Sequence, residues 1–202
     1  MASAVSTEGQ VANLALGLVG QKQVIDNLNE KSVEARTAKQ YFASTRNELL
    51  TSWDWRFCRK TKALALSSET RAGWAYAYVA PADMLKPRFI WSGDRNPGAG
   101  DKIPFDWELN DANTGHLILT DQSQAVLVYT VELATVALWP ALFTKAVAAQ
   151  LAVYFAPSIP VKPQLMPMLQ QGAQLALRVA AAAEGNAATR DPEPDSESVR
   201  IR

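Results

Sequence analysis

The sequence is poor in the residues from which most catalytic and metal sites are built. Its 202 residues include one cysteine, Cys58, and one histidine, His116. A single cysteine excludes a disulfide within the chain and is usual for proteins that fold in a reducing cytosol. One cysteine and one histidine also cannot supply a Cys/His metal cluster, so we expect neither a metal nor a cofactor.

An excess of charge of one sign is also missing. The 20 basic and 20 acidic residues give a formal net charge of zero at pH 7. We therefore expect no overall field that attracts the chain to nucleic acid or to an anionic membrane. No apolar run reaches the ~18 residues of a membrane span, and residues 1–10 lack the pattern of a signal peptide. The sequence predicts synthesis in the cytoplasm and no membrane partner.

The chain does have an ordinary globular composition, with 48% hydrophobic and 20% charged residues. At this length a core can form without disulfides. The most strongly patterned stretch is 32–57, where a helix is predicted with Ser32 as its N-cap. One face of this helix carries apolar or small residues at steps of three and four. These residues are Ala35, Ala38, Phe42, Thr45 and Leu49.

The helix ends in an aromatic cluster at the point where helical spacing gives way to strand spacing. Trp53, Trp55 and Phe57 alternate there with Asp54 and Arg56. We interpret the three aromatic residues as a structural hinge that fixes a helical layer on a sheet.

One more helix is predicted before this stretch and two near the C-terminus. Ser6 or Thr7 caps the first, which runs to about residue 19 with Val11, Leu14, Ala15 and Leu18 on its apolar stripe. The short connection at 26–29 predicts that the first two helices lie side by side and antiparallel. Pro140 begins the third helix, and the last runs over about 164–184. In the third helix one stripe holds Leu142, Ala146, Ala149 and Val153, and a second holds Phe143, Val147, Leu151 and Tyr154.

The middle third alternates with the period of strands. Strands are predicted over 58–66, 74–79, 88–91, 103–109, 116–120 and 125–130, with turns at 67–73 and 83–86 and a loop at 92–100. The short turns favour an antiparallel meander of five or six strands. In the second strand, alternation places Trp74, Tyr76 and Tyr78 on one face.

These patterns predict an α+β fold, in which a small antiparallel β domain is inserted into a helical bundle. The predicted units are N-terminal helices at 1–56, a β unit at 57–131, C-terminal helices at 132–184 and a flexible C-terminal arm at 185–202. The arm has almost no apolar residues before Val199 and Ile201, so by itself it should be disordered. It is either an unstructured remnant or an arm that orders against a partner.

Few residues suggest chemistry. His116 lies in a strand pattern, where a single histidine is usually structural, and no signature supports a dyad with Cys58. Asp106 and Glu108 alternate on a strand and could be the acid/base pair that a glycosidase needs, but we interpret them as part of a solvated strand face. The Trp74/Tyr76/Tyr78 face could stack on sugars or bases, but without a basic groove we interpret it as core or subunit interface. These features leave open a peptidoglycan-cleaving enzyme or a carbohydrate-binding module.

The order of several segments resembles the head–tail adaptor proteins of short-tailed bacteriophages, the tail tubular protein A family. The resemblance covers residues 8–156, and its strongest parts are residues 53–57 and 74–85. The other matching segments, in chain order, are 18–20, 27–30, 33–41, 46–50, 129–130 and 140–143. The match depends on order and spacing and contains no chemical motif.

The resemblance implies a virion structural protein and no enzymatic activity. Members of the family form a ring, usually of twelve copies, that joins the portal to the tail nozzle in the neck of the virion. The ring helps to retain the packaged double-stranded DNA, which passes through its channel without sequence-specific binding. The family fold is a helical bundle joined to a small β domain. A C-terminal segment contacts the portal in the family, which here implies a docking arm containing Arg190, Val199, Arg200, Ile201 and Arg202.

Overall fold

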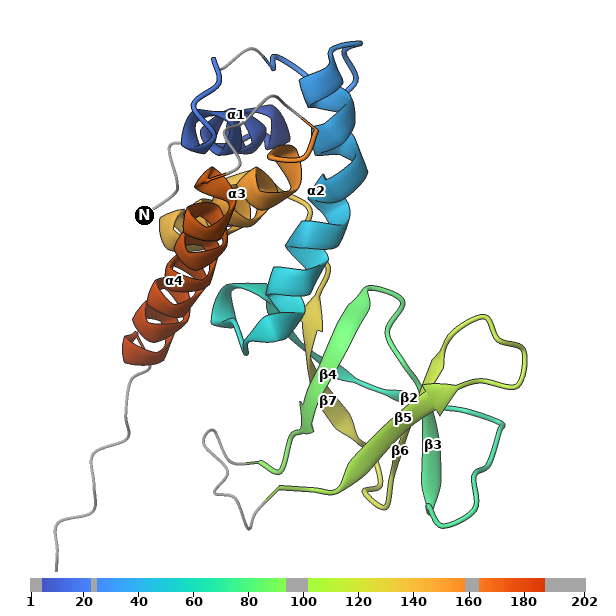
Figure 1. The fold of residues 1–202 in the computed structure, drawn as a ribbon. Coiled ribbons are helices and arrows are strands. Elements are labelled where there is room, and N and C mark those ends of the chain that lie inside the picture. Colours follow the sequence, from blue (N-terminus) through green and yellow to red (C-terminus); the bar gives the residue numbers. More distant parts are fainter. Residues whose placement is uncertain (1–4, 23–24, 94–101, 159–163, 188–202) are drawn as a thin grey trace, which may run out of the picture.

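The computed structural model describes residues 5–22, 25–93, 102–158 and 164–187 (Figure 1). In this part of the chain, helices precede and follow a β unit built of two antiparallel sheets. The structure therefore has the α+β fold that the sequence predicts, with the β unit inserted between the second and third helices. Within the same residues, no helix is both long and apolar enough to cross a membrane.

The helical layer is centred on α3 (Ala141–Phe155), which contacts the three other helices: α1 (Glu8–Leu18), α2 (Val33–Ser52) and α4 (Leu165–Asn186). In Figure 1, α1 lies across the upper part of this layer and α4 extends down one side of it. The predicted side-by-side pairing of α1 with α2 is wrong, because α1 packs mainly on α3. The predicted end of α4 is also early, since the helix includes Gly185 and ends at Asn186.

The connection after α1 folds back onto this helix, which explains why α1 does not lie along α2. Asn13 binds the backbone of Ile25 twice, donating to its carbonyl at 2.7 Å and accepting from its N–H at 3.0 Å. Gly9 is buried where a Cβ would lie 3.2 Å from the carbonyl oxygen of Asp26. A side chain at this position would be in tight contact with that carbonyl, so glycine favours the close approach of the two backbone segments.

Helix α2 has the face and the cap that the sequence predicts. Ala35, Ala38, Phe42, Thr45 and Leu49 are all buried. Ser32 Oγ accepts a hydrogen bond from the N–H of Ala35 at 3.1 Å, and α1 is capped in the same way by Thr7. Each cap satisfies a backbone N–H that has no partner within its helix.

The β unit consists of seven strands in the described residues. Their bounds are β1 (Arg59–Ala63), β2 (Ala65–Leu66), β3 (Tyr76–Val79), β4 (Met84–Ile90), β5 (Phe105–Leu109), β6 (His116–Thr120) and β7 (Val126–Val131). One sheet has the order β1-β7-β4 and the other the order β2-β3-β6-β5. Two short 3-10 segments, η1 (Arg56–Cys58) and η2 (Val136–Leu138), lie where the chain enters and leaves the unit.

The two sheets nearly close into a small barrel. On one side they share the continuous segment β1–β2, which breaks only at Leu64, and on the other an isolated bridge joins Ile90 to Ile103. The predicted meander is wrong, because β7 pairs with β1 and β4 instead of with its sequence neighbour β6. The last strand therefore closes the sheet on the first, so that Arg59 lies opposite Thr130.

Two local predictions in the β unit are also wrong. The predicted turn at 83–86 is largely strand, since β4 begins at Met84. Pro87 lies within β4 and is tolerated there because β4 is an edge strand, and the register of its pairing with β7 shifts on both sides of the proline. Trp74 does not share a face with Tyr76 and Tyr78. Strand β3 begins only at Tyr76, and Trp74 packs against the separate cluster of Ala77, Leu117 and Leu119.

Replacement of Ser32 by alanine should lower the free energy of unfolding by about 1 kcal/mol, because α2 loses its N-cap acceptor. Urea unfolding followed by circular dichroism measures this change. The matched control is Ser32→Thr, which keeps a hydroxyl that can accept from the N–H of Ala35 and donate to Glu30, as Ser32 does, and should remain near the wild-type value. Equal losses in both variants would contradict the role of Ser32 as a cap.

Candidate interaction surface

The joint between the helical layer and the β unit is made by cations from β4 at the C-terminal end of α2. Arg88 Nη2 donates to the carbonyl of Leu50 at 3.2 Å and also to the carbonyl of Trp53. Lys86 Nζ donates to the carbonyl of Thr51 at 2.9 Å. The last carbonyls of a helix have no partner within it and carry the negative end of its dipole, so these two cations stabilise the helix end.

Asp54 completes this joint. It accepts a two-point hydrogen bond from Arg59, at 3.0 and 2.5 Å, and lies 3.5 Å from Arg88 Nε. Arg88 Nε also donates to Thr130 Oγ1 at 2.7 Å, which ties the joint to β7. A guanidinium is suited to such a position because its planar fork can serve several acceptors at once.

The predicted hinge residues lie beside the joint. Trp55 is buried, donates its indole N–H to the carbonyl of Leu49 at 2.7 Å and packs edge-on against Phe143 of α3, with the ring centroids 5.2 Å apart. Phe57 packs on the same ring at 4.9 Å. Trp53 is 47% exposed. The ring contacts of Trp55 and Phe57 with Phe143 therefore lie within the helical layer, and the hydrogen bonds from Arg88 and Lys86 cross to the sheet.

Replacement of Arg88 by methionine should lower the free energy of unfolding by about 1–3 kcal/mol, because the carbonyls of Leu50 and Trp53 lose their donor, while Asp54 keeps the hydrogen bonds from Arg59. Chemical unfolding measures the loss. Lys62→Met, which removes a cation from an exposed position of β1, is the matched control and should change little. Similar effects of the two variants would show that the joint does not depend on Arg88.

Asp83 forms a second polar cluster, at the start of β4. It accepts from Lys60 Nζ at 2.6 Å and from the hydroxyl of Tyr129 at 2.9 Å. The hydrogen bond from Lys60 is the main reason why the pKa of Asp83 lies below its ordinary value; burial opposes this effect, and Tyr129 adds to it. Burial is in turn the main reason why the pKa of Tyr129 rises to about 12.

A lowered pKa in the folded state means that the ionised Asp83 stabilises the fold above its unfolded pKa. This contribution is lost as the pH falls through the lower, folded pKa. As the pH falls from neutral to acidic, the free energy of unfolding should therefore decrease more for wild type than for Asp83→Asn. The difference should be less than about 1 kcal/mol, because the pair of Lys60 and Asp83 is largely exposed to solvent. Unfolding measured in a pH series tests this. Parallel curves for the two proteins would contradict it.

The residues considered for catalysis are not assembled into one site. Cys58 is buried in η1, and burial raises the pKa of its thiol to about 12, so it holds no thiolate at neutral pH. His116 is at the exposed start of β6, where its ring lies 4.8 Å from that of Trp107. Among the described residues, no group of three or more His, Cys, Asp or Glu side chains could hold a metal ion.

The carboxylate pair is engaged in local contacts. Glu108 forms an ion pair with Arg71, which also binds Glu69 at 3.0 Å and Asp111 at 2.9 Å. Asp106 accepts the N–H of its neighbour Trp107 at 2.7 Å. The contacts of Arg71 hold together loops at one end of the β unit, whereas the Asp106 contact stays within β5.

The aromatic face predicted as a sugar platform is divided by the fold. Tyr78 is 3% exposed and its hydroxyl donates to the carbonyl of Gln122 at 2.9 Å. Its ring belongs to the main core, and Trp74 packs on the other cluster. Tyr78 is therefore not available to stack on a sugar.

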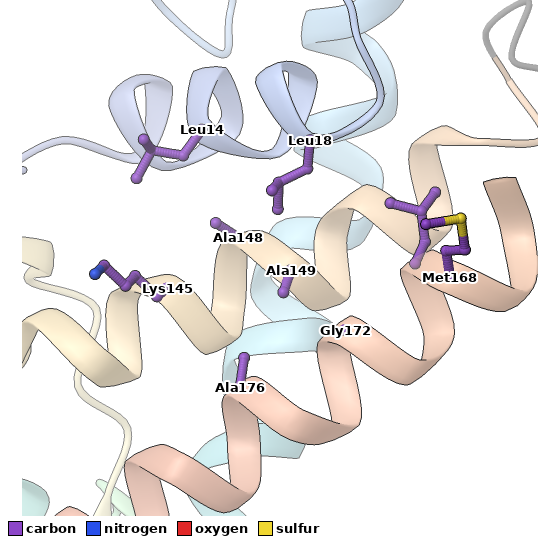
Figure 2. Close-up of a pocket in the computed structure, with 9 residues that line it drawn as sticks. Leu14, Leu18, Lys145, Ala148, Ala149, Met168, Gly172 and Ala176 are labelled. Carbon is purple, nitrogen blue, oxygen red and sulfur yellow. The ribbon is translucent and has the colours of Figure 1, made fainter.

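An unexpected surface lies on the helical layer, where α1, α3 and α4 enclose an apolar groove of about 440 Å³. Figure 2 shows Leu14 and Leu18 of α1 projecting toward Ala148 and Ala149 of α3, with Ala176 of α4 facing the same space. The groove is lined by Leu14, Leu18, Lys145, Ala148, Ala149, Met168, Leu169, Gly172 and Ala176. We call this groove, together with the exposed apolar residues of α4 beside it, the apolar face.

The apolar face is depleted of charge. The charged residues of α1, α3 and α4 are Glu8, Lys145, Arg178 and Glu184. Glu184 is already engaged, because it accepts the backbone N–H of Arg56 at 2.6 Å. The centre of a protein–protein interface typically has this composition, with large exposed apolar side chains and few charged residues around them.

Some residues of this surface were predicted to lie in the core, and that prediction is wrong. Leu14 and Leu18 were expected on the buried stripe of the first helix, but they are 36% and 51% exposed. The buried residues of α1 are Gly9, Val11, Ala12, Ala15 and Leu16. In α3, Leu142 is likewise 36% exposed, although Ala146 and Ala149 of its predicted stripe are buried. The sequence contained a signal for this surface in its scarcity of charge at the outward positions of these helices.

The structure does not describe the predicted docking arm. Arg190, Val199, Arg200, Ile201 and Arg202 lie outside the described residues. A comparison of the chain with protein-family models and with curated proteins finds no match.

Proposed function

We propose that this protein is a virion structural protein, a head–tail adaptor that joins a portal ring to the tail nozzle of a short-tailed bacteriophage. It acts as one subunit of a ring, of twelve copies if it follows the family that it resembles, and helps to retain packaged DNA. It is made in the host cytoplasm and has no enzymatic activity of its own.

The observation that supports this proposal most directly is the architecture. A bundle of two N-terminal and two C-terminal helices with an inserted antiparallel β unit is the fold that the resemblance implies. The segments that carry the resemblance also occupy structural positions. Trp53 and Asp54 take part in the joint, Trp55 and Phe57 lie beside it, and residues 74–85 include β3 and the start of β4.

The apolar face adds independent support for a protein that assembles. Leu18, Met168 and Leu175 are 51%, 67% and 63% exposed on helices that carry few charges. An isolated soluble protein seldom exposes a contiguous surface of this kind, whereas subunits of assemblies do so regularly. The joint also holds the β unit against the helical layer through the contacts of Arg88, as a subunit repeated around a ring requires.

We expect the full chain, mixed with the portal protein of its own phage, to add a ring of density to the base of the portal. Negative-stain images of the mixture, averaged and compared with images of the portal alone, test this directly. Portal rings that remain unchanged in the presence of excess protein would overturn the proposed function.

The docking arm provides a matched variant for this experiment. Val199→Asp combined with Ile201→Asp should weaken binding to the portal, because it replaces the two apolar side chains at the end of the arm. Ser196→Asp with Ser198→Asp adds the same charge to the same segment and should bind nearly as well as wild type. Equal binding by both double variants would remove the arm from the interface.

A further inference from the structure

Two hollows follow one another along the seam between α3 and α4. The first is the groove, where Lys145, Ala148 and Ala149 of α3 face α4 between residues 168 and 176. The second, of about 280 Å³, lies between residues 140–143, at the start of α3, and residues 180–184 of α4. Because the two helices are antiparallel in this order, a segment that turned back from the C-terminal end of α4 would pass the second hollow and then enter the groove.

The groove can accept aliphatic side chains. Its floor includes the small residues Ala148, Ala149 and Gly172, and Leu14 and Leu18 of α1 project toward the same space from the other side (Figure 2). The two leucines are exposed, so an aliphatic group placed here would remove apolar surface from contact with water. The groove therefore suits a short apolar segment.

The part of the predicted arm that follows Ala187 is long enough to reach the groove. Val199 lies twelve residues beyond Ala187, and an extended chain covers ~40 Å over that length at ~3.3 Å per residue. The return path along α4 is shorter, because the fifteen residues from Gly172 to Ala187 rise by only ~22 Å at ~1.5 Å per residue. The difference leaves room for the chain to reverse its direction.

The sequence of the arm matches the groove in two respects. Val199 and Ile201 are its only large aliphatic residues beyond Ala187, and an extended chain directs residues two positions apart to the same side. Residues 191–198, which precede them, include four acidic and no basic side chains. Lys145 lines the groove and forms no ion pair with any other described residue. An acidic segment that ends in two aliphatic residues is thus complementary to an apolar groove with one cation.

The covalent connection favours the chain's own arm over any other segment of the same composition. A short linker holds its end near a site on the same molecule at an effective concentration on the order of millimolar. A second copy in dilute solution presents its arm at a far lower concentration. The groove should therefore be filled from within the same chain.

We propose that the arm of the free chain folds back along α4, with Val199 and Ile201 in the groove and the acidic residues before them beside Lys145. In this state the groove and the aliphatic side chains of the arm cover each other. The inference rests on the function proposed above in one respect, because an arm that contacts the portal must first leave the groove. The groove is then open only on a subunit that has bound a portal.

Paramagnetic broadening of amide NMR signals tests this position of the arm in the full chain. A nitroxide label is attached at Ser196→Cys, and Cys58 stays unlabelled because it is buried and its thiol is protonated at neutral pH. The amide signals of Ala148, Ala149 and Gly172 should lose most of their intensity. The signals of β6, which lies in the β unit away from the groove, should keep theirs (Figure 1).

Two pairs of variants in the labelled chain test the contacts. Ile201→Asp places a charge where the groove needs an apolar side chain and should lower the docked fraction about tenfold or more. Ser198→Asp adds the same charge, keeps both aliphatic residues and should leave the broadening nearly unchanged. Lys145→Glu reverses the charge in the groove and should restore part of the lost intensity, whereas Lys62→Glu makes the same reversal at an exposed position of β1 and should not.

Groove signals that keep their intensity in the labelled wild type would overturn the inference, as would equal effects of Ile201→Asp and Ser198→Asp. A mixture of isotope-labelled chain without nitroxide and nitroxide-labelled chain without isotope identifies the source of the arm. Full broadening in this mixture would show that a second copy supplies the arm, which also overturns the inference.

The proposed function is tested separately, because none of these samples contains a portal. An arm that does not dock leaves the proposed function standing. A docked arm that excess portal does not release, together with portal rings that gain no density, would support the inference and contradict the proposed function.

Discussion

The structure depends on how the C-terminal end of α2 is satisfied. The last carbonyl groups of a helix have no donor within it, and here the donors come from a strand. Arg88 and Lys86 project from β4 to the carbonyls of Leu50, Thr51 and Trp53. The same contacts therefore complete a helix and orient a sheet. The aromatic rings beside them supply burial, and the hydrogen bonds join the end of the helix to the sheet.

Features encoded within one segment could be predicted from the sequence. The buried face of α2 follows from steps of three and four residues, and the caps at Thr7 and Ser32 follow from single side chains that accept a nearby N–H. The α+β class follows from the change of period near residue 57. In each case the physical cause and its effect lie within a few positions of one another in the chain.

Features that depend on distant segments could not be predicted in this way. No local pattern indicates that Arg88 reaches the end of α2, or that β7 pairs with β1 in place of β6. The exposure of Leu14 and Leu18 has the same origin. A helical stripe shows that leucines lie on one side of a helix, but which leucines are covered depends on how far α3 and α4 extend beside it. The leucines of the candidate surface were assigned to the core because their types are those of core residues, and only the scarcity of charge on these helices indicated otherwise.

The insertion of the β unit has a consequence for the order in which the protein can fold. The unit closes on itself, with Arg59 opposite Thr130, so all of its strands have been synthesised once the ribosome has passed β7. Helices α1 and α2 are synthesised earlier, but at that stage they lack the residues against which they pack in the folded protein. Tyr41 stacks on Tyr154, with the ring centroids 4.8 Å apart, and Phe42 on Trp139 at 6.1 Å, and both partners follow the β unit in the chain. During synthesis the middle of the chain can therefore fold first, while the first two helices wait for the last two.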